Sequence, residues 1–344
     1  MTFRLFFGLL ILFFGNILTA AEIKLNPAHP VEYTVKRGDT LWNIAGKFLK
    51  NPWQWNEIWQ SNSQIKNPDL IFPGDIIVLS FVDGKPQLSF AGNQNNGKAE
   101  LAPKIREVSI QEAIKIIPIE AIAPFLSSPK IVDKKQLDSA PYVVDFAKEH
   151  LLAGAGDRIY VRSIEHPATL NFTVYRKGKK FEMPDSKEIL GFEAIYIADA
   201  VLQNSGDPAT LEITQSKNVI RKGDKLMATE NGHLTLNFFP QAPERQIRGQ
   251  IISVLDGVAQ IGQHHIVAIN KGAANGLKSG HVLQILQRGE TIIDPFARLK
   301  NDEVTLPDEE AGILMVFRVF DHISYALVMS AKNAIHVSDY VVTP

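Results

Sequence analysis

None of the 344 residues is cysteine, so any catalysis or metal binding would depend on histidine, serine, lysine or acidic side chains. Without cysteine there are no disulfides, thiolate zinc sites, iron–sulfur clusters or cysteine nucleophiles. None of the nine histidines falls in a His-Glu-x-x-His or His-x-His pattern, the close spacings that bring zinc ligands together on one ion. The sequence therefore predicts neither a metal site nor a cofactor.

One set of serines and lysines follows the order used by penicillin-binding proteins. In those enzymes the first serine and lysine share the start of a buried helix, whereas here Pro129 stands between them. A Gly-x-Ser-x-Gly elbow is absent. A transpeptidase, carboxypeptidase or cell-wall hydrolase with an unfamiliar site in the C-terminal region remains the alternative to a non-catalytic binding function. The three parts of the set are Ser127-x-x-Lys130, Ser216-x-Asn218 and Lys278-Ser279-Gly280.

Charge and the N-terminus limit the partners and the compartment. With 36 basic and 37 acidic residues, the chain lacks the positive field that non-specific nucleic-acid binding needs. Arg4, an apolar run from Leu5 to Phe14, and Ala20-Ala21 before Glu22 are the parts of a secretory signal. A membrane anchor is the alternative, but the apolar stretch is at the lower limit for spanning a bilayer. We expect a signal peptide over 1–21 and a periplasmic mature protein with no membrane segment.

Positioning elements follow the signal in a clear order. A compact block occupies 31–82, and a polar, glycine-containing stretch predicts a linker over 83–104. Ser109 and Glu112 form a capping box, which predicts a helical strap over 105–132. Pro118 and Pro124 divide this strap into two short turns.

The remainder, 133–344, reads as a β-rich sandwich or small barrels, with 140–230 and 245–344 as an alternative division into two units. One phrase recurs and predicts a shared turn, in which glycine has a positive φ and the next residue caps the turn into a strand. The stretch from Ala273 to Leu283 also resembles the turn of PDZ domains, so peptide capture is a side hypothesis. The phrase occurs at Gly74-Asp75, Gly156-Asp157, Gly223-Asp224 and Gly280-His281.

The block at 31–82 predicts strand, helix, helix, strand. An alternating strand reaches a turn at Lys36 to Gly38, and Asp39 or Thr40 caps a helix whose apolar face begins at Leu41. Pro52 suits the first turn of a second helix. All four tryptophans lie here: Trp42, Trp55 and Trp59 are expected in the core, and Trp53 points away from that face.

At these residues the sequence resembles the LysM domain family. The opening Tyr33-Thr-Val-x-x-Gly-Asp-Thr-Leu-Trp-x-Ile-Ala and the closing Asn67-Pro-Asp-Leu-Ile-x-Pro-Gly-Asp match it in order and separation. The resemblance implies a βααβ fold, giving an α+β module before the mainly β region. It also implies binding of glycans containing N-acetylglucosamine, in bacteria usually peptidoglycan.

The family's groove lies between the loop after the first strand and the loop before the second. Exposed loop N–H and C=O groups suit acetamido and hydroxyl groups, and leucine and isoleucine suit the acetyl methyl and the sugar faces. Trp53 is the candidate for additional sugar stacking or domain docking. The groove residues implied by the resemblance are Gly38, Asp39, Thr40 and Leu41 on one side, and Asn67, Pro68, Asp69, Leu70 and Ile71 on the other.

The whole chain is similar to a family of exported bacterial proteins that join one LysM domain to a long C-terminal region without assigned activity. The stretches beginning at Asn67, Gly154, Gly191, Arg248 and Leu314 show this likeness. We therefore expect a peptidoglycan-binding envelope protein whose β-rich region presents a surface to an envelope protein or to the wall.

Overall fold

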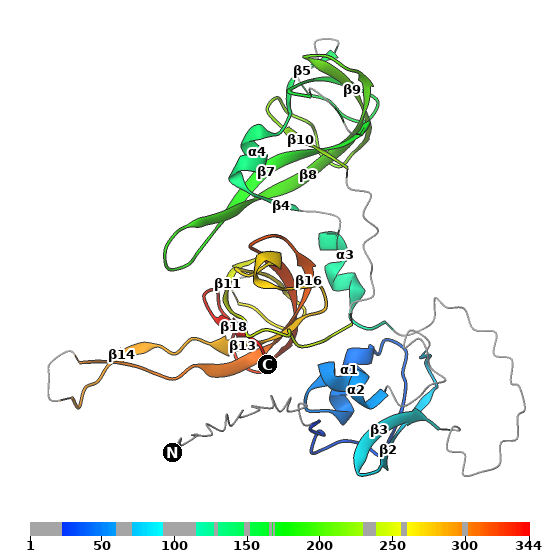
Figure 1. The fold of residues 1–344 in the computed structure, drawn as a ribbon, viewed down its shortest axis with the longest axis vertical. Coiled ribbons are helices and arrows are strands. Elements are labelled where there is room, and N and C mark those ends of the chain that lie inside the picture. Colours follow the sequence, from blue (N-terminus) through cyan, green and yellow to red (C-terminus); the bar gives the residue numbers. More distant parts are fainter. Residues whose placement is uncertain are drawn as a thin grey trace, which may run out of the picture.

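The computed structural model describes residues 23–59, 71–91, 115–126, 130–147, 152–164, 167, 169–229, 239–255, 260–297 and 302–344. The predicted signal peptide and the capping box at Ser109 and Glu112 lie outside these residues. Strands outnumber helices, and a small α+β module precedes a β-rich region, which confirms the predicted fold class (Figure 1). Within the described parts of the chain, no helix has both the length and the apolar character needed to cross a bilayer.

The N-terminal module has the predicted order of elements. Strand β1 (Glu32–Thr34) pairs antiparallel with β2 (Ile76–Val82). Helix α1 (Leu41–Phe48) begins where Thr40 Oγ1 accepts the N–H of Asn43 at 3.2 Å, so Thr40 rather than Asp39 is the N-cap. Pro52 opens a single 3₁₀ turn, η1 (Pro52–Gln54), which leads into α2 (Trp55–Trp59).

A third strand extends this sheet into the segment that the sequence predicts as a linker. Strand β3 (Lys85–Phe90) pairs with residues 77–82 of β2 across a two-residue turn at Asp83 and Gly84. These two residues have φ values of 49° and 77°, the left-handed conformations of a tight hairpin turn. Leu88 is buried against the module, so the core includes residues beyond position 82.

The tryptophans lie as predicted. Trp42, Trp55 and Trp59 are buried, whereas Trp53 is partly exposed. Trp55 and Trp59 meet edge to face with ring centroids 6.5 Å apart, and Trp59 meets Phe90 of β3 in the same way at 5.6 Å. Three large rings thus fill much of a small core.

The β-rich region forms barrels rather than a sandwich. In the first barrel, β8 pairs with β7 and also with β9, and this second pairing closes the sheet order β8-β7-β10-β5-β6-β9 into a ring, with β4 added at β8. Helix α4 (Lys134–Ser139) begins with a capping box at Asp133. The strands are β4 (Lys130–Val132), β5 (Tyr142–Phe146), β6 (Arg158–Arg162), β7 (Asn171–Glu182), β8 (Ile189–Asn204), β9 (Ala209–Ser216) and β10 (Lys225–Ala228).

The second barrel is closed in the order β11-β12-β17-β16-β13-β18. A separate two-stranded arm, β14 paired with β15, projects from it (Figure 1). The long β7–β8 hairpin reaches this barrel, where Lys179 Nζ donates to Ser253 Oγ at 3.0 Å. The elements are β11 (Arg248–Val254), β12 (Ile266–Ile269), η5 (Ala273–Asn275), β13 (Val282–Gln287), β14 (Thr291–Ile293), β15 (Glu303–Thr305), β16 (Glu309–Val319), β17 (Ser324–Ala331) and β18 (Tyr340–Val342).

The recurring Gly-Asp phrase is a shared turn, as predicted. All four glycines have φ between 87° and 93°. In each turn the next side chain accepts the backbone N–H three residues earlier, so that the carboxylate or imidazole fixes the turn from inside. These bonds run from Phe72 to Asp75 at 2.8 Å, Gly154 to Asp157 at 2.9 Å, Arg221 to Asp224 at 2.8 Å and Lys278 to His281 at 3.2 Å.

The predicted helical strap contains one helix and one strand in its described residues, instead of two short turns: Lys115 to Pro118 are not helical, and Lys130–Val132 form β4. Helix α3 (Ile119–Leu126) follows Pro118 and includes Pro124. A proline inside a helix removes one N–H donor and so weakens the helix. Packing compensates here, because Ile122 and Leu126 are buried in the core shared with the LysM-like module and the second barrel.

Candidate functional site

Two loops of the N-terminal module are brought side by side by backbone bonds. The N–H of Val35 donates to the C=O of Asp75, and the N–H of Gly74 donates to the C=O of Val35, both at 2.8 Å. The loop after β1 and the end of the loop before β2 therefore meet at one edge of the module. This is the place where the sequence predicts a ligand groove.

Asp39 shapes the first of these loops from within. Its Oδ2 accepts the N–H of Lys36 at 2.8 Å and the hydroxyl of Tyr33 at 2.9 Å. Burial, followed by the hydrogen bond to Asp39 and the charge of Asp39, raises the pKa of Tyr33 to about 12. Gly38 has a φ of 90°, and a side chain added there would meet no atom within 4 Å, so glycine is required by conformation and not by crowding.

The predicted groove residues differ in how accessible they are. Thr40 is mostly buried with its hydroxyl engaged as the N-cap, while Leu41 and Ile71 belong to the core. Gly38 is exposed and Asp39 is partly exposed. Asn67, Pro68, Asp69 and Leu70 lie outside the described residues, so one wall of the groove is defined here by Ile71 alone.

The strap crosses the first loop at the N-terminus of α1. The N–H of Leu41 donates to the C=O of Lys115 at 2.9 Å, and the N–H of Trp42 donates to the C=O of Ile116 at 3.2 Å. Thr40 and Lys115 form an isolated parallel bridge. The first N–H groups of a helix have no partner within it, and here the strap supplies acceptors for two of them. No local pattern in the sequence indicates this pairing.

Trp53 lies on a different face, at a cleft of about 600 Å³ between the module and the second barrel. Its ring stacks on Trp42 with centroids 6.5 Å apart and an angle of 26° between the planes. An aromatic face surrounded by amide and charged side chains suits a polar ring such as a sugar. The polar residues at this cleft include Asn26, Asn43, Asn51, Gln263, Gln284, Glu310 and Lys332.

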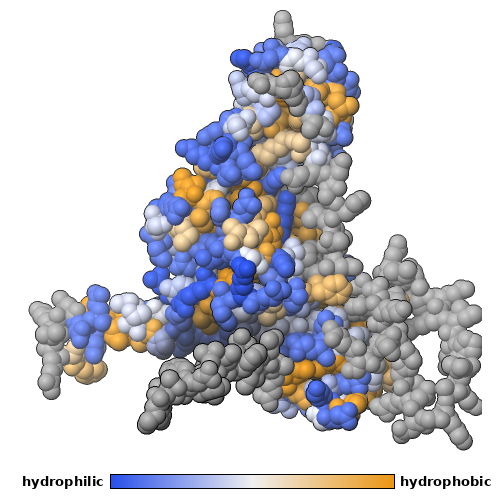
Figure 2. Space-filling model, in the orientation of Figure 1, coloured by the Kyte–Doolittle hydropathy of each residue, from blue (hydrophilic) through white to orange (hydrophobic). Residues whose placement is uncertain are grey.

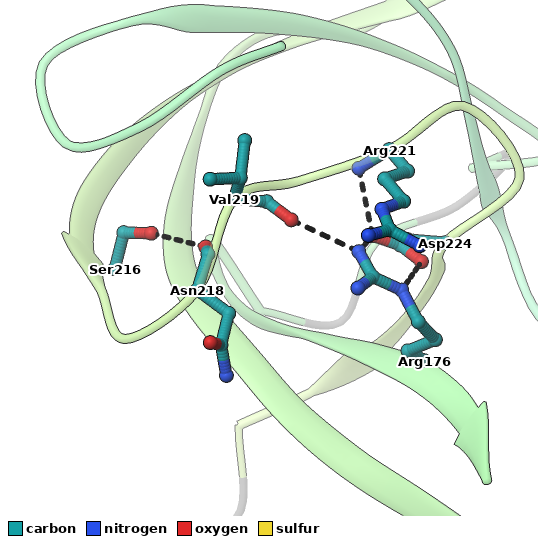
Figure 3. A network of polar contacts seen from close by, with 6 residues as sticks. All are labelled: Arg176, Ser216, Asn218, Val219, Arg221 and Asp224. Carbon is teal, nitrogen blue, oxygen red and sulfur yellow. Dashed lines mark hydrogen bonds and ion pairs between the residues drawn. The ribbon is translucent and has the colours of Figure 1, made fainter.

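The residues ordered as in penicillin-binding proteins lie in separate places. Ser216 ends β9 in the first barrel, and its Oγ donates to the C=O of Asn218 at 2.6 Å (Figure 3). Ser279 belongs to the second barrel, and its Oγ donates to the C=O of Phe317 at 3.1 Å. Lys130 begins β4, and Ser127 lies outside the described residues. Both described serines are held in turns by backbone acceptors and share no site.

Among the residues that the structure describes, no three His, Asp or Glu side chains lie close enough together to hold a metal ion. His281, the most buried of the described histidines, has its Nδ1 committed to the N–H of Lys278. Burial holds the pKa of His281 below its usual value. Its role is therefore to fix a turn.

The N-terminal module combines two short helices with a small antiparallel sheet in the order strand, helix, helix, strand, followed by the hairpin strand β3. Residues 33–80 match the model of the LysM domain, and this segment is a LysM domain. LysM domains bind peptidoglycan and other glycans that contain N-acetylglucosamine. They are binding modules and have no catalytic activity of their own.

A protein of Bacillus subtilis (strain 168) described as "Uncharacterized protein YqbP" is similar to this chain in the LysM region. The two are 44% identical over 55 residues, which cover 13% of this chain and 25% of that protein. The chain thus spans about a quarter of this relative's length. The likeness concerns the LysM region and carries no information on the two barrels.

Proposed function

We propose that this protein binds peptidoglycan in the periplasm through its LysM domain and performs no catalysis. The match of residues 33–80 to the LysM domain is the observation that carries the proposal. The proposed contacts are Gly38, Asp39, Thr40, Leu41, Asn67, Pro68, Asp69, Leu70 and Ile71.

The backbone at the start of α1 has the chemistry that an acetamido group requires. The N–H groups of Leu41 and Trp42 have no acceptor within the helix, and a helix N-terminus attracts a carbonyl oxygen through such donors and its dipole. The main-chain oxygens of Lys115 and Ile116 occupy these donors in the structure, so carbonyl oxygens fit there. The neighbouring Leu41 and Ile71 offer apolar contact to an acetyl methyl once the groove is open. Both kinds of contact are shallow, so we expect weak binding by one module and stronger retention on long glycan strands.

The Trp53 cleft is a second place for sugar contact within the same proposal. A partly exposed ring, braced from behind by buried Trp42, gives a rigid stacking surface. The amides around it can bind hydroxyl groups. A strand of peptidoglycan held at the groove would gain affinity from a further saccharide unit stacked here.

For the β-rich region, divided into units at 140–230 and 245–344, we propose a docking role toward an envelope protein. The arm formed by β14 and β15 supports this, because its apolar side chains are exposed and Phe296 shows 93% of its surface to solvent. Figure 2 shows apolar residues along this projecting arm. The exposed apolar residues of the arm are Ile292, Ile293, Phe296, Val304 and Leu306.

Sacculus pull-down tests the binding function. We expect the full chain to sediment with purified sacculi and a variant lacking 31–80 to remain in the supernatant, provided that circular dichroism shows its barrels intact. A matched control, Phe296→Ser, keeps the LysM domain and should sediment like the parent. Unchanged sedimentation of the deletion variant would overturn the proposal.

Crosslinking in the envelope tests the docking role. Removing the exposed ring of Phe296 should abolish a protein crosslink made from the arm, since apolar contact is the main interaction that an exposed phenylalanine offers. Mass spectrometry of crosslinked species from parent and Phe296→Ser cells measures this. Identical crosslinks in both would exclude the arm as the docking surface.

A further inference from the structure

The start of α1 is already occupied by another part of the same chain. In the described residues, the acceptors for Leu41 and Trp42 N–H are the main-chain oxygens of Lys115 and Ile116, at 2.9 and 3.2 Å. These contacts join positions more than 70 residues apart, and the bridge between Thr40 and Lys115 continues them. The strap thus lies along the loop for which glycan contact is proposed.

Burial extends the contact beyond the backbone. Ile116 is 7% exposed and Ile117 is fully buried, and both belong to the core cluster that contains Leu41 and Ile71. The two groove residues best suited to an acetyl methyl, Leu41 and Ile71, are 3% and 0% exposed in this conformation. A glycan can reach them only after the packing of this cluster opens.

The strap is held at its other end by the second barrel. Arg318 Nη1 of β16 donates to the C=O of Phe125 near the end of α3 at 2.9 Å. Lys115 pairs with Glu120, which ties the crossing segment to the start of α3. Ile122 is fully buried in the shared core. The segment over the groove is thus fixed to the barrel and not only to the LysM domain (Figure 1).

We propose that residues 115–117 act as an intramolecular pseudo-ligand of the LysM groove, and that glycan binds there only when this segment is displaced. The inference rests on the proposed glycan-binding function and adds its regulation. The C=O groups of Lys115 and Ile116 take the donors that an acetamido oxygen would use. Ile116 and Ile117 add apolar side chains to the cluster that contains Leu41 and Ile71.

Competition of this kind lowers the apparent affinity without altering the intrinsic one. The apparent Kd equals the intrinsic Kd divided by the fraction of molecules with an open groove. A segment tethered in the same chain competes at a high effective concentration. Weakening the strap should therefore strengthen glycan binding, which is the opposite of what damage to a binding site does.

The first test compares two isoleucines of equal burial. Ile116→Gly loosens the strap, and Ile164→Gly makes a matched change in the first barrel, where the residue is 6% exposed against 7% for Ile116. Calorimetric titration with a soluble oligomer of N-acetylglucosamine should show about tenfold tighter binding for Ile116→Gly if the open fraction rises by that factor. Ile164→Gly should bind like the parent.

The outcomes separate the inference from the function beneath it. Equal, measurable affinity in the parent and Ile116→Gly would overturn the inference and leave glycan binding intact. No binding by either protein, with both folded, would overturn both. Tighter binding by both glycine variants would assign the effect to general loosening and would also overturn the inference.

A disulfide that holds the strap on the groove gives the complementary test, and it remains informative if Ile116→Gly folds poorly. The parent has no cysteine, so Thr40→Cys with Lys115→Cys introduces one pair, at two positions already joined by a bridge. Thr40 is itself the N-cap and a proposed contact, so the two forms are compared with each other and not with the parent. The oxidised form should bind the oligomer at least tenfold more weakly than the reduced form. Equal, measurable binding by the oxidised and reduced forms, with the disulfide verified by mass spectrometry, would overturn the inference.

Discussion

The same turn serves two different purposes in the LysM domain and in the first barrel. At Gly38-Asp39 and at Gly223-Asp224, the glycine has a φ of 90° and the aspartate accepts the N–H three residues earlier at 2.8 Å. Beyond that bond the surroundings differ. Asp39 is partly exposed and also accepts a hydrogen bond from Tyr33, whereas Asp224 is 5% exposed and accepts two from Arg176.

The bonds around Asp224 form a closed structural network (Figure 3). Arg176 Nε and Nη2 reach the two carboxylate oxygens at 2.9 and 2.7 Å, and Nη2 also donates to the C=O of Val219. The hydrogen bond to Asp224 raises the pKa of Arg176. One turn therefore locks strands together in the barrel, while the other leads to the helix N-terminus that the strap covers. The motif sets the local geometry, and its neighbours set the role.

The largest expected effect is loss of the barrel turn. Asp224→Ala leaves a quarter-exposed guanidinium and the N–H of Arg221 without their partner. We expect the free energy of unfolding to fall by about 3 kcal/mol, the lower end for breaking a buried pair, measured by urea titration. At urea concentrations at which Asp224→Ala is still folded, it should sediment with sacculi like the parent. A loss of glycan binding from the folded variant would break the distinction between the two turns.

A smaller effect is expected at the LysM turn. Asp39→Ala removes an acceptor of two hydrogen bonds and should lower the free energy of unfolding by about 1.5 kcal/mol, because charged acceptors are stronger than neutral ones. It should also weaken glycan binding, since the loop before α1 loses its brace. Urea titration and oligomer calorimetry measure the two effects. Full glycan affinity in this variant would show that the turn has no part in the groove.

The smallest effect concerns pH. The pKa of Tyr33 rises from 10.0 to about 12 in the folded protein, so the native state holds this proton more tightly than the unfolded chain. Its contribution to stability is complete below the unfolded pKa and is lost as pH rises through the folded value. As the pH rises from 10.0 to about 12, the urea midpoint of Tyr33→Phe should therefore fall less than that of the parent. Identical pH profiles would contradict this role for Tyr33.

Much of the LysM domain could be predicted because its information is local. A cap at Asp39 or Thr40, the apolar spacing of α1 and the placement of Trp53 off the helical core face can all be read from neighbouring residues, and the structure decides the cap for Thr40. Asp83-Gly84 is a two-residue hairpin signal, but the polar stretch after residue 91 favours a linker, so the sequence does not predict strand β3. The recurring turns were predicted correctly, yet the closure of the strands into rings depends on pairings between distant residues.

The candidate site shows the same limit. Gly38 and Asp39 could be assigned to the loop from their types, but the pairing of Leu41 with Lys115 could not, because backbone acceptors have no residue-type signature. Nothing in the sequence near Ile116 indicates whether this segment only precedes helix α3 or also occupies the LysM groove. Asn67 to Leu70 stay predictions.

Amide chemical-shift mapping tests the central claim most directly, namely that glycan binds at the loop before α1. On titration of the full chain with a soluble oligomer of N-acetylglucosamine, the amides of Leu41 and Trp42 should shift most, together with those of Lys115 and Ile116 as the strap leaves. Shifts confined to the indole of Trp53, with the Leu41 and Trp42 amides unchanged at saturation, would contradict the account.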